Sequence, residues 1–133
     1  MKRLFTVVFV SLLLMACGGL SDKARHIVGT YYNTSISDDI PVFELNRDGS
    51  CLMRAIRPDV LTISVKGTWN VVDDTLVIHH DLATITAEGD TSLMGTVAPE
   101  FKAKVTGYTD YSLTLLRDGV EYEFMKQNVA VAE

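Results

Sequence analysis

A two-residue alternation of apolar and polar side chains is the strongest pattern in this sequence. The segment LTISVKGTW places Leu61, Ile63 and Val65 on one face of an extended chain and threonine, serine and lysine on the other, and FKAKVTGY and VEYEF repeat the rhythm. This period is typical of strands with one face in a core and one in water. It excludes an α-helical domain beyond Asp22, where almost no helical period is found.

Turn-forming residues separate these alternating segments at short intervals. Asn46–Gly49, Asp73–Asp74, Thr109–Asp110 and Asp118–Gly119 lie between them, and Asp-Gly is a strong hairpin signal. Short connections favour antiparallel pairing of consecutive strands. The sequence therefore predicts eight strands, at residues 27–33, 39–46, 50–56, 61–70, 75–82, 100–108, 111–117 and 120–126.

Closure of these strands into a single antiparallel, eight-stranded up-and-down barrel is the predicted all-β fold. Closure removes the two exposed edges of an open sheet, although a two-layer β-sandwich has the same alternation and remains the alternative. An eight-stranded barrel is either filled by its side chains or holds one small ligand. The residues expected to face inward are Ile27, Tyr31, Phe43, Leu45, Leu61, Ile63, Val65, Trp69, Leu76, Ile78, Phe101, Val105, Leu113, Leu115, Tyr122 and Phe124.

Residues 83–99 form the one long connection. They are rich in threonine and glycine. We expect them to hold either another short strand or a flap.

The N-terminus has the layout of a secretory signal. Met1, Lys2 and Arg3 form a basic head, and the run Leu4–Ala16 is apolar except for one threonine and one serine. At 13 residues it is shorter than the roughly 20 that a spanning helix needs. Its last residues and the following cysteine, LMAC, resemble the lipobox of bacterial lipoproteins, which implies cleavage before Cys17 and lipidation of its thiol.

The predicted domain organisation follows from this resemblance. Residues 1–16 form the signal peptide, residues 17–25 the lipidated cysteine with a flexible tether, residues 26–127 the barrel and residues 128–133 a C-terminal tail. The predicted location is the cell envelope, and Gly18 after the cysteine, in place of an inner-membrane-retaining aspartate, favours the outer membrane.

The charge of the cleaved protein bears on its partners. Removal of the signal leaves 10 basic against 17 acidic side chains, a formal charge of −7. Such a module is repelled by phosphate backbones, so no nucleic acid partner is expected. The predicted contacts are the membrane, through the lipid, and a small hydrophobic ligand or an envelope protein or glycan.

The strand segments together resemble the lipocalin-like lipoproteins of bacterial envelopes. The matching pieces are IVGTYYN, VFELNRDGSCLM, KGTWNVVDDTLVI and YSLTLLRDGVEYEFMK, over roughly residues 26–126. Classical lipocalins carry Gly-x-Trp on the first strand, where this chain has Tyr31, and Thr-Asp-Tyr before the seventh strand, as in Thr109–Tyr111. The resemblance implies a barrel that binds small apolar ligands and is rarely catalytic.

Four side chains are the candidate ligand-binding residues, namely Tyr31, Trp69, His80 and Tyr122. The alternation from Leu76 places His80 inward, either as a polar anchor in a pocket or as a hydrogen-bonded core histidine. The aromatic residues either line a cavity or fill the core.

Neither catalysis nor a metal site is expected. Cys51 has no base nearby in the sequence, and His79 with Asp81 supplies only two ligands of a metal site. No cofactor or catalytic motif is found. We therefore expect a non-enzymatic, membrane-anchored protein whose barrel binds a small apolar or amphipathic ligand, the alternative being a protein- or glycan-binding accessory module with a solid barrel core.

Overall fold

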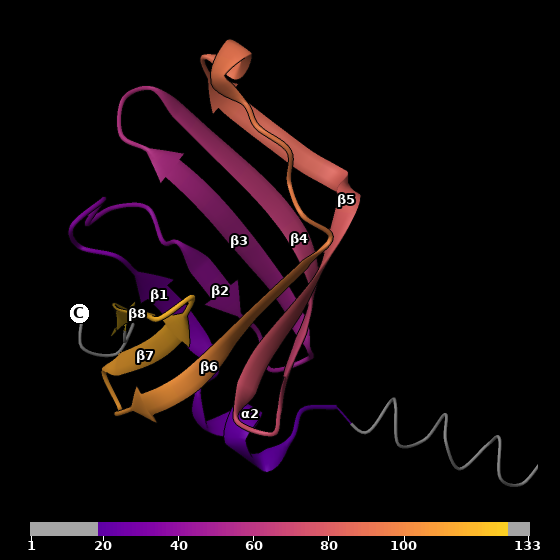
Figure 1. Cartoon of the computed structure of the whole chain (residues 1–133), viewed down its shortest axis with the longest axis vertical. Coiled ribbons are helices and arrows are strands. Elements are labelled where there is room, and N and C mark those ends of the chain that lie inside the picture. Colours follow the sequence, from indigo (N-terminus) through magenta and orange to yellow (C-terminus); the bar gives the residue numbers. More distant parts are fainter. Residues whose placement is uncertain (1–18, 128–133) are drawn as a thin grey trace, which may run out of the picture.

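The computed structural model describes residues 19–127, and in it the sheet closes into an antiparallel barrel with strand order β1 to β8. The closed barrel confirms the predicted fold class and excludes the sandwich. Figure 1 shows β3, β4 and β5 extending beyond the other strands. The strands are β1 (Gly29–Tyr32), β2 (Phe43–Leu45), β3 (Ser50–Arg57), β4 (Leu61–Val72), β5 (Thr75–Gly89), β6 (Glu100–Tyr108), β7 (Ser112–Arg117) and β8 (Val120–Gln127).

Eight strands match the predicted number, but the second is much shorter than the predicted 39–46. Local hydrogen bonds compete with the strand there: the Asn33 side chain accepts from the Ser35 amide, and the Ser37 hydroxyl accepts from the amides of Asp39 and Ile40. Pro41 has no amide hydrogen to give to a ladder. Pairing with β1 therefore starts only at Phe43.

The fifth strand is longer than the predicted 75–82 and takes in the first half of the 83–99 connection. A bulge between Ser64 and Lys66 shifts the register of β4 against β5, and the Lys66 amide donates to the Thr84 hydroxyl at 2.9 Å. Pairing then continues to Leu61 opposite Gly89. The remaining part contains a 3-10 helix, η1 (Thr91–Leu93), and an extended segment; we call residues 90–99 the strap.

Part of the predicted tether is folded. Residues Asp22–His26 form a short helix, α2, capped by Ser21, and Leu20 and Ala24 are buried. Ser21 binds the end of β4, because its amide donates to Asn70 Oδ1 at 2.9 Å and its hydroxyl to the Val71 carbonyl at 2.8 Å. The expectation of a tether as far as residue 25 is therefore wrong from Leu20 onward, since an apolar residue and a helix cap hold this segment on the barrel.

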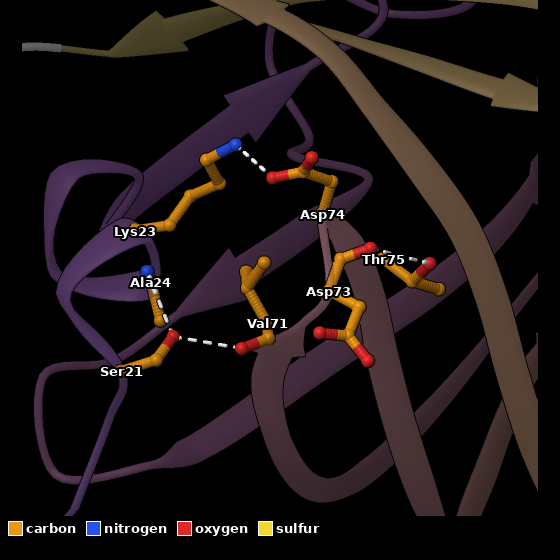
Figure 2. A network of polar contacts seen from close by, with 7 residues as sticks. All are labelled: Ser21, Lys23, Ala24, Val71, Asp73, Asp74 and Thr75. Carbon is orange, nitrogen blue, oxygen red and sulfur yellow. Dashed lines mark hydrogen bonds and ion pairs between the residues drawn. The ribbon is translucent and has the colours of Figure 1, made fainter.

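Helix α2 closes one end of the barrel, which we call the closed end. Figure 2 shows Lys23 paired with Asp74 in the β4–β5 turn, beside the bonds of Ser21 to Ala24 and Val71. The core that fills this end contains Leu20, Ala24, Ile27, Tyr31, Leu45, Trp69, Val71, Leu76 and Ile78. Within residues 19–127, no helix is long and apolar enough to cross a bilayer.

The predicted inward-facing set agrees with the structure except at the other end, the mouth. Ile63 and Phe101 are only half-buried, and Tyr122 is 44% exposed. Tyr122 nevertheless pairs with the buried Leu115, so its side chain is on the inner face. These three inner-face side chains are therefore accessible to solvent at the mouth.

Candidate functional site

A hollow of about 280 Å³ lies inside the mouth of the barrel, and we call it the mouth hollow. Its deep wall is apolar and includes an edge-to-face pair of Phe43 and Phe124, with ring centroids 4.8 Å apart. Five strands contribute side chains, because alternate residues of each strand point inward. The lining residues are Val42, Phe43, Met53, Phe101, Ala103, Leu115, Arg117, Asp118, Tyr122 and Phe124.

Polar groups gather at the rim of the mouth hollow. Arg117 and Asp118 stand at the β7–β8 turn, and the Arg117 guanidinium carbon lies 4.7 Å from the centre of the Phe101 ring. Asp118 and Gly119 both have positive φ, which gives the tight turn that the Asp-Gly pair predicted. The rim thus offers a cation, a carboxylate and the Tyr122 phenol above an apolar wall. This distribution suits a molecule with an apolar body and a polar end.

A second hollow of about 120 Å³ surrounds the inner side of His80. His80 pairs with Gly67 across the sheet, so its imidazole has no cross-strand side chain to pack against. Met53 lines both this hollow and the mouth hollow. The other lining residues are Arg54, Ala55, Ile63, Val65 and Val97.

The imidazole of His80 is incompletely hydrogen-bonded. Its Nδ1 is shielded from solvent and has no partner. Burial lowers the pKa of His80, so the neutral ring is favoured. Since an unpaired buried polar atom costs about 1–3 kcal/mol, a hydrogen bond to this nitrogen would remove that cost.

A third hollow, of about 420 Å³, lies between the strap and the outer part of β3 and β4. It shares Ala55, Ile63 and Val97 with the hollow at His80. A backbone hydrogen bond holds each end of the strap. The Asp90 amide donates to the Val60 carbonyl, and the His80 amide donates to the Pro99 carbonyl, each at 2.8 Å. Arg57 is the charged residue of its lining.

The four predicted ligand-binding residues divide into two pairs. His80 and Tyr122 line hollows, though different ones. Tyr31 and Trp69 are 1% and 3% exposed and belong to the packed closed end. Both polar groups donate to backbone carbonyls. The Tyr31 hydroxyl donates to the Ile27 carbonyl at 2.7 Å, and the Trp69 indole donates to the Asn46 carbonyl at 2.9 Å. Cys17, the predicted lipidation site, lies outside the described residues.

The sequence analysis expected only half of the residues that line the mouth hollow to face inward, and Met53 and Arg117 are among those that it missed. Met53 sits on an inner position of β3, and Arg117 ends β7 next to the turn. Alternation could have found Met53, because Cys51 and Met53 continue the inner face. The position of Arg117 over Phe101 depends on the pairing of β6 with β7 and had no signal in the sequence.

Two further reactive side chains of the described residues, Cys51 and His79, lie in different surroundings. Cys51 is buried at 3% exposure, and burial raises the pKa of its thiol to about 11. His79 is exposed on the outer face, and its Nδ1 lies 3.2 Å from Glu100 Oε2. Over residues 19–127, no three His, Cys, Asp or Glu side chains are grouped so as to hold a metal ion.

The chain is similar in structure to two solved proteins. No protein-family model matches the chain, and no curated protein matches it. A lipocalin-like protein from Bacteroides uniformis aligns at 16% identity with a TM-score of 0.49, over 77% of this chain and 99% of that one. An uncharacterized protein from Bacteroides eggerthii aligns at 18% identity with a TM-score of 0.44, over 66% of this chain and 84% of that one.

Proposed function

We propose that this protein is a lipid-anchored envelope protein whose barrel binds a small apolar or amphipathic ligand in the mouth hollow. The observation that carries the proposal is the hollow itself, about 280 Å³ of space with apolar walls inside a closed barrel. That volume is near the lower end of the range of small-molecule sites, roughly 300–1,000 Å³. It equals the volume that about nine water molecules occupy in the liquid. Apolar walls offer such water molecules few hydrogen-bond partners.

The polar rim supports an amphipathic ligand over a purely apolar one. Arg117, Asp118 and Tyr122 border the opening, while Phe43, Leu115 and other apolar groups form the depth. A ligand whose apolar part enters first keeps its polar end among these groups. Burial of apolar surface then supplies affinity at about 25 cal/mol per Å², and the rim orients the ligand.

The anchor rests on the sequence of the N-terminus. The basic head, the short apolar run and LMAC support signal cleavage before Cys17 and lipidation of its thiol. Two or three acyl chains hold a protein durably, because each buried methylene contributes about 0.8 kcal/mol. Mass spectrometry of the mature N-terminus tests this part. A Cys17→Ser variant is expected in the soluble fraction, and an unmodified Cys17 in the native protein would contradict the anchor.

Ligand binding is tested with a fluorescent apolar dye, 1-aminoanthracene, and competition by straight-chain alcohols. The wild-type protein is expected to show saturable fluorescence enhancement that alcohols reverse. Ala103→Phe adds a ring inside the mouth hollow. We expect it to raise the dissociation constant of the dye about tenfold or more, which is equivalent to about 1.4 kcal/mol of binding free energy.

Lys102→Phe is the matched control, since it adds the same ring one residue away on the exposed outer face. Its dye affinity is expected to equal that of the wild type. Circular dichroism verifies that both variants are folded. The proposal fails if the wild type does not bind the dye, or if Ala103→Phe binds it as well as Lys102→Phe does.

A further inference from the structure

The connection between Cys17 and the folded domain is very short. Leu20 is 6% exposed and belongs to the core, and Ser21 is bound to Asn70 and Val71. Cys17 and Leu20 are three residues apart, so their Cα atoms are separated by at most about 11 Å. A lipid on Cys17, which is part of the function proposed above, would therefore leave the barrel almost no freedom to move away from the bilayer.

Leu20 is attached at the closed end of the barrel. The position of an added Cβ on Gly49, in the β2–β3 turn, is 4.0 Å from a methyl group of Leu20. Lys23, on the same helix, is paired with Asp74 in the β4–β5 turn. Both turns thus share an end of the molecule with α2, as Figure 1 shows for the β4–β5 turn.

The mouth and the strap lie at the opposite end. Strand β5 starts beside α2 at Thr75 and runs for 15 residues to Gly89, next to the strap. At about 3.3 Å per residue, this strand is roughly 50 Å long. The β7–β8 turn at the mouth is also on the far side. Arg117 lies over Phe101, which is three residues along β6 from Lys104, the partner of Thr75, in the direction of the strap.

The geometry points to a fixed orientation on a lipid surface, in which the closed end rests on the bilayer and the mouth faces away from it. The surface next to the anchor is suited to headgroups, with charges of both signs at Asp22 and Arg25 and the Lys23–Asp74 ion pair. Val72, the last residue of β4 before the same turn, is also exposed. In this orientation, the ligand enters the mouth hollow from the aqueous side and does not enter laterally from the leaflet that holds the anchor.

Energy transfer to the bilayer tests this orientation. The lipidated full-length protein carries Cys51→Ala, so that one introduced thiol takes the donor dye, and it is incorporated in phosphatidylcholine vesicles with an acceptor on the headgroups. Arg47→Cys labels the β2–β3 turn at the closed end, and Thr91→Cys labels the strap; both side chains are exposed. Transfer is expected to be at least severalfold more efficient from position 47 than from position 91.

A flexible Gly/Ser insertion between Gly19 and Leu20 is the control, and it is expected to remove most of the difference between the two labels. Equal transfer from both labels without the insertion, or more from position 91, would overturn the orientation while leaving the anchor intact. Failure of the protein to remain with the vesicles would instead refute the lipid anchor, and the orientation with it.

Discussion

Gly67 of β4 lies against the carbonyl group of His79 on β5, so that a Cβ added to Gly67 would be 2.1 Å from that oxygen. No side-chain movement relieves this contact, because the obstructing atom belongs to the backbone of a paired strand. The contact also explains why the inner face of β4 is bare opposite His80, where the second hollow begins. A single glycine therefore allows the close approach of these two strands.

Gly67→Ala is expected to destabilise the protein by about 3 kcal/mol or more, because two backbones would have to separate. Gly107→Ala is the matched control, since a Cβ at Gly107 of β6 meets nothing within 4 Å. Its effect is expected within about 0.5 kcal/mol of the wild type. Urea denaturation measures both, and equal stability of the two variants would contradict the steric argument.

Tyr31→Phe is expected to lower the free energy of unfolding by about 1–2 kcal/mol. The hydroxyl donates to the Ile27 carbonyl at 2.7 Å in the buried closed end, and its removal leaves that oxygen without this partner. Tyr32→Phe, on the neighbouring, half-buried side chain, provides the comparison. Thermal denaturation gives the difference, and an unchanged Tyr31→Phe midpoint would show that the bond contributes nothing.

The thiol of Cys51 is expected to resist alkylation in the native protein. With its pKa raised to about 11 by burial, only about one thiol in a thousand is ionised at pH 8, and the group is shielded as well. Iodoacetamide should react at least a hundredfold faster after unfolding in urea. In a Cys51→Ala protein, Thr91→Cys should react at similar rates in both states, and rapid labelling of native Cys51 would disprove its burial.

His80 is expected to make stability depend on pH below its ordinary pKa of about 6.5. Burial lowers its pKa in the folded state, so the unfolded chain binds the proton more readily. The contribution of the neutral ring to the free energy of unfolding is fully present above pH 6.5. It is lost as the pH falls through the lowered pKa of the folded state.

Denaturant titrations at pH 7.5, 6.0 and 5.0 measure this dependence. A His80→Gln variant should show a smaller loss of stability over this interval than the wild type. Identical slopes for wild type and His80→Gln would mean that the folded state does not disfavour the charged ring.

The fold could be predicted from the sequence because the information is local. Alternation at Leu61, Ile63 and Val65 identifies an inner face within a few residues, and Asp118–Gly119 identifies a turn within two. The errors occurred where local bonding or a distant partner decided the outcome. The serine and asparagine caps shortened β2, and the bulge at Lys66 allowed β5 to continue to Gly89.

The candidate site was predictable only in part. The alternation of apolar and polar residues placed His80 and Tyr122 on an inner face, and both line hollows. The same alternation selected Tyr31 and Trp69, which are packed in the closed end. Periodicity reports which face a side chain occupies. It does not report how far along the barrel the interior is filled.

The sequence by itself determined eight strands, their inner faces and their antiparallel order, since these follow from side chains two residues apart and from short turns. Only the tertiary structure decided that Leu20 and α2 close one end while the other end keeps an apolar hollow under Arg117 and Tyr122. The physical reason is that a cavity is the space left between side chains from strands far apart in the chain, so its position depends on register, bulges and packing that no local pattern contains.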